Sequence, residues 1–412
     1  MRSPRATTRR RLPRDVVVLG WVSYLADVSG EMIYPLMPIF LVGVLGASAT
    51  TLGGIEGAAA LLVACATVWA GFTSDRRRRR TPFVRIGYGL PVVGKTMMAL
   101  AVGWPMVLAG RLVDRLGKGL RTSPRDALIA DAAGPDIRGR AFGFHRAMDT
   151  AGALVGVLLA AGLLWWLTGS PLESETAPHT VGSGRAIRVV FGVAAGLGLL
   201  SFALTWAVRE RERPSPRGTP TPAAAPTGLL GMPGSYWRAV GPLLVFALAN
   251  SSDLFLVLRA RDVGLSAWAV VLAYAVFNLT YAAASAPAGA LSDRLGRWRI
   301  ILLGWIVYAG VYVGFAVTGP AGVWPLFALY GVYMAMTEGV GRALISDHAP
   351  AAARGAGLGL YTVMSGVVSL LASVMAGVLW DRVGPAAVFV AGAGLAGLAV
   401  LIAHIRRPGH AP

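Results

Sequence analysis

Charged side chains are scarce in this sequence. Only 14% of its 412 residues are charged, whereas 55% are hydrophobic, and the mean hydropathy is +0.61. Soluble domains typically carry about 25% charged residues, so a chain this apolar does not fit that class. The shortage of charge therefore indicates a polytopic membrane protein.

Cysteine and histidine are also rare, which limits the chemistry the chain can perform. The single cysteine, Cys65, lies within an apolar run, so disulfides and thiol-rich metal sites are excluded. The five histidines show no ligand spacing, and neither a metal nor another cofactor is expected. The only match to a Gly-x-x-x-x-Gly-Lys-Ser/Thr phosphate loop, Gly89 to Thr96, lies inside an apolar run and not at a strand-to-helix turn, and a Gly-x-Ser-x-Gly elbow is absent. ATP-driven transport and enzymatic activity therefore have no support in the sequence.

Acidic residues are outnumbered by basic ones, 20 against 38, which gives a formal net charge of +18. A basic balance of this size can indicate nucleic-acid binding. Here, however, the arginines are divided among short turns between apolar runs and do not form one continuous face. Nucleic acid is therefore not an expected partner.

Long apolar runs are abundant. After a longer first run, they recur at about 20 residues, the length an α-helix needs to cross a bilayer. They predict twelve transmembrane helices and an all-α membrane protein, with spans at about 17–46, 50–72, 83–103, 105–124, 141–167, 187–208, 237–258, 266–290, 300–318, 323–343, 356–379 and 385–405.

Arginine and lysine collect on one side of the predicted membrane. That side holds the N-terminal arm 1–14, the turns at 76–80 and 294–299, and the C-terminal tail 406–412. The turns on the other side, at 44–49, 103–105 and 319–323, contain no charge. Because short basic loops stay in the cytoplasm, the pattern predicts a multi-pass protein of the cell membrane with both termini cytoplasmic.

The two halves of the chain repeat each other. Gly71-Phe-Thr-Ser-Asp75 before five arginines recurs as Gly289-Ala-Leu-Ser-Asp293, and Ala127-Leu-Ile-Ala-Asp131 recurs as Ala343-Leu-Ile-Ser-Asp347. Offsets of 218 and 216 in register indicate one duplicated unit. Residues 209–235, rich in proline, threonine, alanine and arginine, have the composition of a linker. We therefore expect a six-helix bundle at 15–208, a cytoplasmic linker at 209–235 and a second bundle at 236–405.

The pattern Gly-x-x-x-Asp-Arg before a basic cluster resembles the loop signature of the major facilitator superfamily of transporters. With six plus six predicted helices and a central linker, the resemblance covers essentially the whole chain. It implies two bundles around a central cavity, alternating access, and a solute bound near the bilayer midplane. The resemblance also implies a monomer.

The resemblance further implies that the twin turns lock the halves together. An aspartate beside arginines is suited to a breakable ionic latch, and glycine lets helices approach closely. The first copy departs from the family pattern, since Arg78 stands where glycine is usual. The alternative is that the five arginines only set topology. The expected latch residues are Gly71, Asp75, Arg76, Gly289, Asp293, Arg294 and Arg297.

Charges within the predicted spans are the candidates for coupling, because an ionised group at the bilayer centre costs roughly 2.5–3.5 kcal/mol even on the lenient insertion scale. Asp27 and Glu31 are four residues apart, and Tyr34 is seven from Asp27, so all three are expected on one helix face. Two carboxylates this close in low dielectric tend to hold a proton between them. The alternative is that one of them pairs structurally with a base on another helix.

Other intramembrane candidates are spread over several spans. Asn250 occupies the position in the second half that corresponds to Asp27 in the first. Asp253, three residues further on, is therefore a plausible cavity residue. Lys95 and Asp149 are possible partners across helices, whereas Glu338 and Arg342, four apart, can satisfy each other structurally. Glu56 completes this group.

The fourth span carries a continuous polar stripe. Its members follow at i, i+3, i+4 and i+7, so the stripe cannot face lipid and must face either the cavity or water. They are Arg111, Asp114, Arg115 and Lys118. Arg111 resembles the family's membrane-embedded arginine, which is implicated in proton coupling. In the fifth span Gly152-x-x-x-Gly156 resembles the family's antiporter motif, but Val157 replaces its proline.

These observations predict a secondary active transporter of a small organic solute, coupled to protons through Asp27, Glu31 and Arg111. Export is the first expectation, and proton-linked uptake of an anionic or polar solute is the second. A transporter fold used as a receptor or scaffold is a third, weaker alternative. Basic cavity residues favour an anionic solute and the carboxylates favour a cation, so the sequence leaves the substrate open.

Overall fold

The computed structural model describes residues 12–168, 181–210, 231–350 and 353–405. The expected tail at 406–412 lies outside these residues, as do most of the expected arm at 1–14 and most of the expected linker at 209–235.

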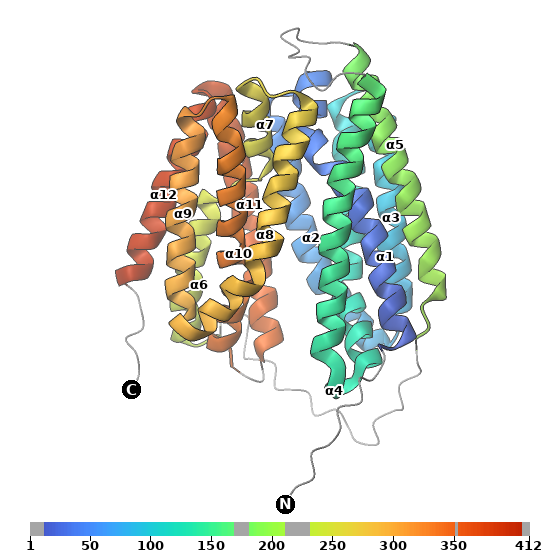
Figure 1. The fold of residues 1–412 in the computed structure, drawn as a ribbon. Helices are drawn as coiled ribbons and strands as arrows, with labels where there is room; N and C mark the ends of the chain where they lie inside the picture. Colours follow the sequence, from blue (N-terminus) through green and yellow to red (C-terminus); the bar gives the residue numbers. More distant parts are fainter. Residues whose placement is uncertain (1–11, 169–180, 211–230, 351–352, 406–412) are drawn as a thin grey trace, which may run out of the picture.

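The described residues form helices and short connections without a β-strand. The longer helices stand upright side by side in one bundle (Figure 1). They are α1 (Arg14–Glu31), α2 (Ala49–Arg77), α3 (Thr81–Ala99), α4 (Trp104–Thr168), α5 (Val181–Leu204), α6 (Gly234–Ala249), α7 (Leu254–Asp262), α8 (Ala267–Leu295), α9 (Arg297–Val317), α10 (Val323–His348), α11 (Arg354–Arg382) and α12 (Pro385–Ile405).

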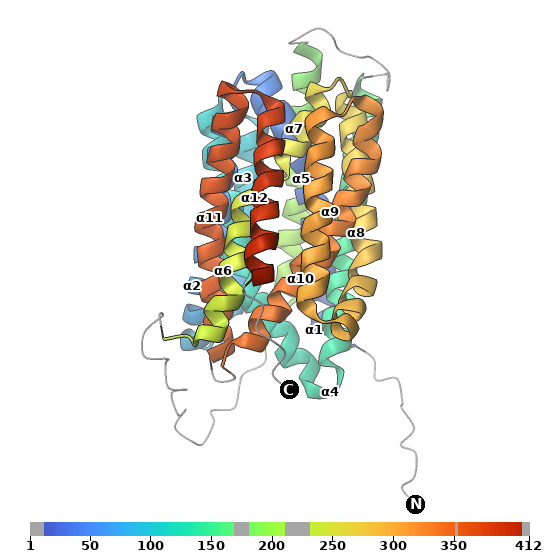
Figure 2. The same cartoon turned by 90° about the vertical axis from the view of Figure 1, so that its left-hand side faces the viewer.

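Helices α1 to α5 form one half of the bundle, and α6 to α12 form the other (Figures 1 and 2). Helix α1 begins and α12 ends at the same end of the bundle, the lower end in Figure 1. We call this end the basic side, because the arginine-rich turns after α2 and α8 lie there, and we call the other end the opposite side.

The twelve predicted spans fall on these helices with three irregularities. Nine helical segments of the described chain are long and apolar enough to cross a membrane; the three remaining predicted spans fall on α3, the first part of α4 and α10. Helix α4 is continuous over 65 residues and carries two predicted spans. The seventh predicted span, 237–258, is broken between α6 and α7.

The first predicted span, 17–46, is also broken, which corrects the placement of Tyr34. Regular helix ends at Glu31, followed by a 3-10 turn (Tyr34–Leu36) and a π-helical turn (Ile39–Val44). Pro35 explains the break, because it lacks an N–H and its ring would clash with the carbonyl of Glu31 four residues earlier. Tyr34 therefore does not continue the helix face of Asp27 and Glu31.

The two halves meet closely along α2 and α11. A Cβ on Gly53 would lie 2.0 Å from the carbonyl oxygen of Ser373, and one on Gly57 would lie 2.7 Å from the Cα of Leu370. Near the opposite side, Gly377 lies equally close to the backbone of Thr50. Small residues thus allow the two backbones to touch, the usual way membrane helices associate.

We expect Gly53→Ala to destabilise the protein. The added methyl group has no space against Ser373, and overpacking of this kind typically costs about 1–3 kcal/mol. Gly54→Ala is the matched control, because nothing lies within 4 Å of its Cβ position. Thermal unfolding followed by tryptophan fluorescence should show a lower Tm for Gly53→Ala only. Equal Tm values would contradict the close packing of this seam.

Apolar packing joins the halves mainly toward the opposite side. One large buried cluster combines Met32, Phe40 and Leu52 of the first half with residues such as Phe255 and Tyr274 of the second. A separate cluster around Val16, Tyr88 and Ile129 contains only first-half residues and lies toward the basic side. Apolar packing therefore holds the halves together toward the opposite side and joins them less tightly toward the basic side.

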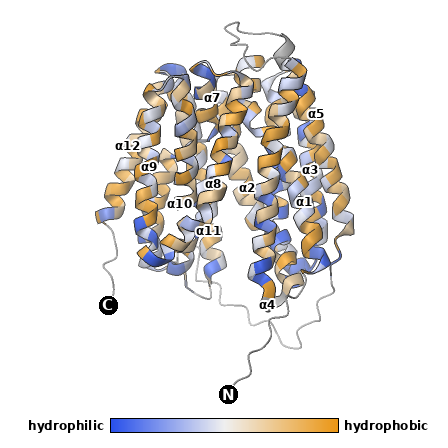
Figure 3. Cartoon of the chain, in the orientation of Figure 1, coloured by the Kyte–Doolittle hydropathy of each residue, from blue (hydrophilic) through white to orange (hydrophobic). Residues whose placement is uncertain are grey.

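The outer faces of the helices are apolar, as expected for contact with lipid. Large hydrophobic side chains are exposed there, among them Trp69, Phe72, Ile306 and Leu371. In Figure 3 hydrophobic residues cover the outward faces, while hydrophilic residues gather at the lower end and along α4. The surface and the interior thus have the polarity of a membrane-embedded bundle.

Candidate functional site

A pocket of about 890 Å³ lies at the seam between the halves. Its walls come from the basic-side parts of α4, α8 and α10, and many of the lining residues are small. It reaches from Tyr281, midway along α8, to Asp293 and Arg297 at the basic side. A volume of this size is in the range of pockets that bind drug-sized molecules.

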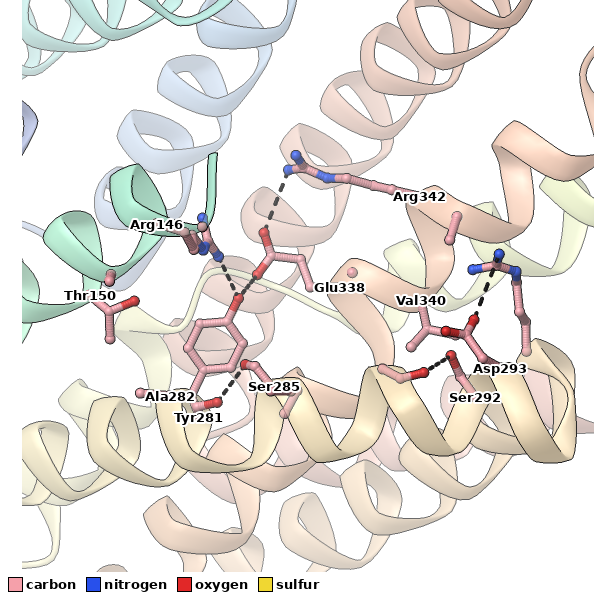
Figure 4. Close-up of a pocket in the computed structure, with 18 of the residues that line it drawn as sticks. Arg146, Thr150, Tyr281, Ala282, Ser285, Ser292, Asp293, Glu338, Val340 and Arg342 are labelled. Atoms are coloured by element: carbon pink, nitrogen blue, oxygen red, sulfur yellow. Dashed lines mark hydrogen bonds and ion pairs between the residues drawn. The ribbon is translucent and has the colours of Figure 1, made fainter. Parts of the chain in front are cut away.

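A polar chain crosses the pocket from one half to the other (Figure 4). Arg146 of α4 donates from Nη2 to the hydroxyl oxygen of Tyr281 on α8 at 3.0 Å. The Tyr281 hydroxyl in turn donates to Oε2 of Glu338 on α10 at 2.5 Å, and Oε1 of Glu338 lies 3.5 Å from Arg342. The expected local pairing of Glu338 with Arg342 is present, but Glu338 also faces the seam.

Arg111 and Glu56 form a buried ion pair. Arg111 donates from Nε and Nη2 to the two carboxylate oxygens of Glu56 at 2.7 and 2.8 Å, a bidentate arrangement. Both side chains are at least nine-tenths buried. The ring of Tyr34 lies 5.5 Å from the Arg111 guanidinium. Two residues that the sequence offered as separate candidates are therefore one unit between α2 and α4.

The polar stripe on α4 changes its surroundings along its length. Asp114 is buried beside Arg111 at 4.0 Å and Arg115 at 3.4 Å, whereas Lys118 is exposed. The upper part of the stripe is therefore buried among other helices, and its lower part reaches solvent. A cavity-lining role for the stripe stays a prediction.

Asp27 and Glu31 lie one helical turn apart near the end of α1, in the interior of the bundle. Glu31 lies near Tyr274 of α8, and Oε2 of Glu31 is buried without a hydrogen-bond partner among the described residues. The rings of Tyr34 and Tyr274 lie 5.6 Å apart. Glu31 thus lies close to the second half of the molecule at Tyr274, whereas Asp27 is one turn further from it.

Lys95 and Asp149 are not partners. Lys95 is buried and donates to the hydroxyl of Ser29 at 2.6 Å, whereas Asp149 lies 3.3 Å from Nδ1 of His145, four residues earlier on α4. The possible cross-helix pair was wrong because both groups find nearer partners, which the sequence distance does not reveal.

Asp253 follows the break between α6 and α7 and accepts a hydrogen bond from Tyr330 at 2.6 Å. The same hydroxyl lies 3.4 Å from Oδ1 of Asn250. Buried tyrosines surround this point, with Tyr308 and Tyr333 among them. The polar groups at the break therefore lie among buried aromatic side chains, and non-helical backbone at membrane depth is tolerated where protein surrounds it.

The twin basic turns form matching ion pairs, each within its own half. Arg80 bridges Asp75 and Asp131 in the first half, and Arg297 bridges Asp293 and Asp347 in the second. The two aspartates at the ends of the repeated Ala-Leu-Ile segments therefore have equivalent partners. Arg76 and Arg294 are exposed, and Gly71 lies against Ser123 whereas Gly289 lines the pocket.

Arg78 takes the place of a glycine in conformation as well as in sequence. Its φ of 52° is left-handed, and Gly296, its equivalent in the second turn, has φ of 92°. The Glu210 carboxylate fixes the start of α3, because it accepts hydrogen bonds from the backbone N–H groups of Arg80 and Thr81. Burial acts to raise the pKa of Glu210, but these hydrogen bonds outweigh it and hold the pKa below its usual value.

A polar contact that sequence reasoning missed joins the halves at the opposite side. The Asp381 carboxylate, at the end of α11, accepts hydrogen bonds from the backbone of Ala49 and Thr50 and from the Thr50 hydroxyl, at 2.6–3.0 Å. An anion at a helix N-terminus is favoured by the exposed N–H groups. The signal was present, since Gly377-Val-Leu-Trp-Asp381-Arg382 repeats the pattern of the two basic turns.

We expect Asp381→Ala to weaken closure at the opposite side. Loss of an exposed helix-terminal anion costs about 1 kcal/mol, which changes the ratio of closed to open forms roughly fivefold. Spin labels at Val102 and Val383, with Cys65 replaced by serine, would report the separation by double electron–electron resonance. Longer distances should gain population in Asp381→Ala and not in the control Arg382→Gln. Identical distributions would show that this contact does not hold the halves.

Arg146 and Tyr281 were also missed. They are separated by 135 residues and belong to no repeated segment. Only packing of α4 against α8 brings them together, so no local pattern marks them.

Comparison with known proteins places this arrangement in a family. The family model described as Major Facilitator Superfamily matches residues 19–373. An uncharacterised MFS-type transporter of Methanocaldococcus jannaschii is 32% identical over 394 residues, covering 94% of this chain and 93% of that protein. The multidrug resistance protein MdtH of Cronobacter sakazakii is 27% identical over a shorter stretch, 38% of this chain and 44% of that protein.

Solved structures with this fold have little sequence similarity to the chain. A mutant of the nucleoside transporter NupG superposes with a TM-score of 0.76 at 12% identity, covering 96% of this chain and all of that one. A bacterial homologue of the human lysosomal transporter Spinster, in an inward-facing and unoccupied conformation, superposes with a TM-score of 0.72 at 15% identity, covering 95% and 94%.

Proposed function

The chain belongs to the Major Facilitator Superfamily, and we propose that this membrane transporter exports a small organic solute in exchange for protons by alternating access. The observation that carries the proposal is the pocket between the halves. Ionisable side chains from both halves line it, Arg146 from the first and Glu338 from the second. Such a pocket at a repeat interface is where alternating access delivers a solute. The partial similarity to multidrug resistance proteins supports export.

Orientation belongs to the same proposal. The basic side faces the cytoplasm, because short arginine-rich loops are retained there. The pocket then opens toward the cytoplasm and the apolar contacts between the halves close the outer side. This state would receive a solute for export.

Coupling is assigned to Asp27 and Glu31. They lie within the bundle, and Glu31 is close to Tyr274 of the other half, so a proton on this pair changes the charge near the contact between the halves. A charged pair in low dielectric is unfavourable, and one bound proton relieves the repulsion. Arg111 belongs to the same proposal, and Glu56 holds its guanidinium beside Tyr34.

Proton-linked uptake is the second candidate, and the guanidinium groups in the pocket favour it. Arg146, Arg297 and Arg342 line the pocket against two carboxylates, Asp293 and Glu338. A proton that travels with an anionic solute compensates its charge. Export and uptake differ only in the direction of the proton relative to the solute.

Current recording from proteoliposomes on a solid support tests the proposal. Chemically diverse solutes are applied as concentration jumps at two pH values, with empty liposomes as control. A solute-specific current whose size or sign changes with pH is expected. A solute-specific current that does not depend on pH would contradict proton coupling, and a flux assay would follow for solutes that give no current.

A further inference from the structure

We propose that the pocket at the seam binds an organic anion, and that the Arg146 guanidinium holds its acidic group in place of the Tyr281 hydroxyl. The proposal rests on the proposed transport function and names the class of solute. The sequence left this open, because the interior contains both acids and bases.

The carboxylates of the pocket already have partners of their own. Glu338 accepts from Tyr281 through one oxygen and faces Arg342 through the other. Asp293 lies 3.9 Å from Arg297, which also pairs with Asp347. A cationic solute would therefore have to compete with arginine for each of these acids.

Arg146 is in a different position. Among the described residues, the Arg146 guanidinium donates its hydrogen bond to the neutral phenol oxygen of Tyr281. A guanidinium carries five donors in a planar fork that matches a carboxylate or phosphate, and a phenol oxygen satisfies only part of that fork. Arg146 is exposed and lines the pocket, so an incoming anion can reach it. Charge-assisted bidentate bonds would then replace one neutral bond.

Asp149 does not offset this charge through direct contact. It is one turn further along α4, and its Oδ2 faces His145 at 3.3 Å. The nearest acid across the pocket is Glu338, which reaches Arg146 only through the Tyr281 hydroxyl. The region around Arg146 thus favours one additional negative charge.

The rest of the pocket has room for an apolar body. Small side chains line it on all three helices, including Ala147, Ala151, Ala282, Ala286, Ala335 and Gly339. With about 890 Å³ available, a ring or a short chain attached to the acidic group fits beside them.

Binding at this place would also act on the conformation. Arg146 belongs to the first half and Tyr281 to the second, so their bond links the halves across the pocket. An anion that takes over the guanidinium breaks this link, while Tyr281 keeps its hydrogen bond to Glu338 within the second half. A ligand that binds two states differently shifts the population between them.

Binding of four ligands to the purified full-length protein tests the class. Benzoate, benzamide and benzylamine share one ring and differ in charge, and 1-naphthoate extends the apolar body. Thermal unfolding followed by tryptophan fluorescence should show stabilisation by the two carboxylates and none by the amide or the amine.

Variants then locate the site. Arg146→Gln is expected to weaken carboxylate binding by about tenfold or more, since a hydrogen bond to a charged group contributes about 1.5–3 kcal/mol. Arg146→Lys should retain part of the affinity, and Tyr281→Phe should bind benzoate at least as well as the wild type. Arg299→Gln, an exposed arginine outside the pocket, is the matched control and should bind normally.

Three results would overturn the proposal: stabilisation by benzylamine rather than benzoate, no stabilisation by either carboxylate, or unchanged binding in Arg146→Gln. These results concern binding alone. Arg146-dependent binding without proton-coupled transport would retain the site and refute the transport proposal, whereas proton-coupled transport of a solute that ignores Arg146 would do the reverse.

Discussion

Asp27→Asn or Glu31→Gln is expected to abolish solute transport driven by a proton gradient while leaving solute exchange at equilibrium. Each substitution keeps the shape of the side chain and removes its ability to exchange a proton. Glu31 lies close to Tyr274 of the other half, and a pair with one fewer ionisable group still permits the halves to move with solute bound. Only the link between the solute and the proton is lost.

Flux into proteoliposomes separates the two activities. Driven uptake is measured with an imposed pH gradient, and exchange is measured with labelled solute at equal concentrations and equal pH on both sides. Asp15→Asn is the matched control, because Asp15 lies in the first turn of α1, away from the pair, and bonds the backbone of Arg209. Unchanged driven transport in both coupling variants would refute the assignment.

Breaking the buried pair of Arg111 and Glu56 should give the largest loss of stability. Glu56→Gln leaves a buried guanidinium without its bidentate partner, and removing one member of a buried pair typically costs about 3–5 kcal/mol. The double change Glu56→Leu with Arg111→Met should cost much less, because no charge is then left unpaired.

The exposed pair of Glu338 and Arg342 provides the comparison. The Arg342 side chain is 74% exposed, so Glu338→Gln should change stability by no more than about 1 kcal/mol. Thermal and denaturant unfolding of the purified variants measure all three. If Glu56→Gln were as stable as Glu338→Gln, the buried pair would not have the role that its geometry indicates.

Much of the fold could be predicted because bilayer thickness and backbone satisfaction leave few options. Apolar runs of one length indicated helices, and the repeat of the basic turns indicated two equivalent halves. The breaks were harder to see, since they depend on single residues. Pro35 ends α1 at Glu31, and Asn250 to Asp253 separate α6 from α7 within runs that look continuous by hydropathy.

The candidate site could be predicted only in its components. Intramembrane charge is costly, so Glu56, Arg111 and Asp253 could be singled out without a structure. Their partners could not be identified, because helices far apart in sequence supply them: Glu56 pairs with Arg111, and Asp253 accepts from Tyr330. A pairing guessed from charge alone, Lys95 with Asp149, was wrong for the same reason.

The twin turns show what a repeated sequence does and does not imply. Repetition indicated equivalent roles, and Arg80 and Arg297 do bridge equivalent aspartates. Repetition did not indicate which half each partner belongs to. In this conformation the ion pairs of each turn stay within the half to which that turn belongs. Locking of the halves by these turns stays a proposal for the state in which the basic side is closed.

Proton movement during transport is the most direct test of the central claim, that Asp27 and Glu31 couple solute to proton. Proteoliposomes are loaded with the pH-sensitive dye pyranine, and the membrane potential is clamped with potassium and valinomycin. A solute that gives a pH-dependent current is then added outside. The wild type should make the lumen more alkaline as solute enters in exchange for protons, and both coupling variants should not. Solute entry without a pH change, or an unchanged pH response in both variants, would contradict the account.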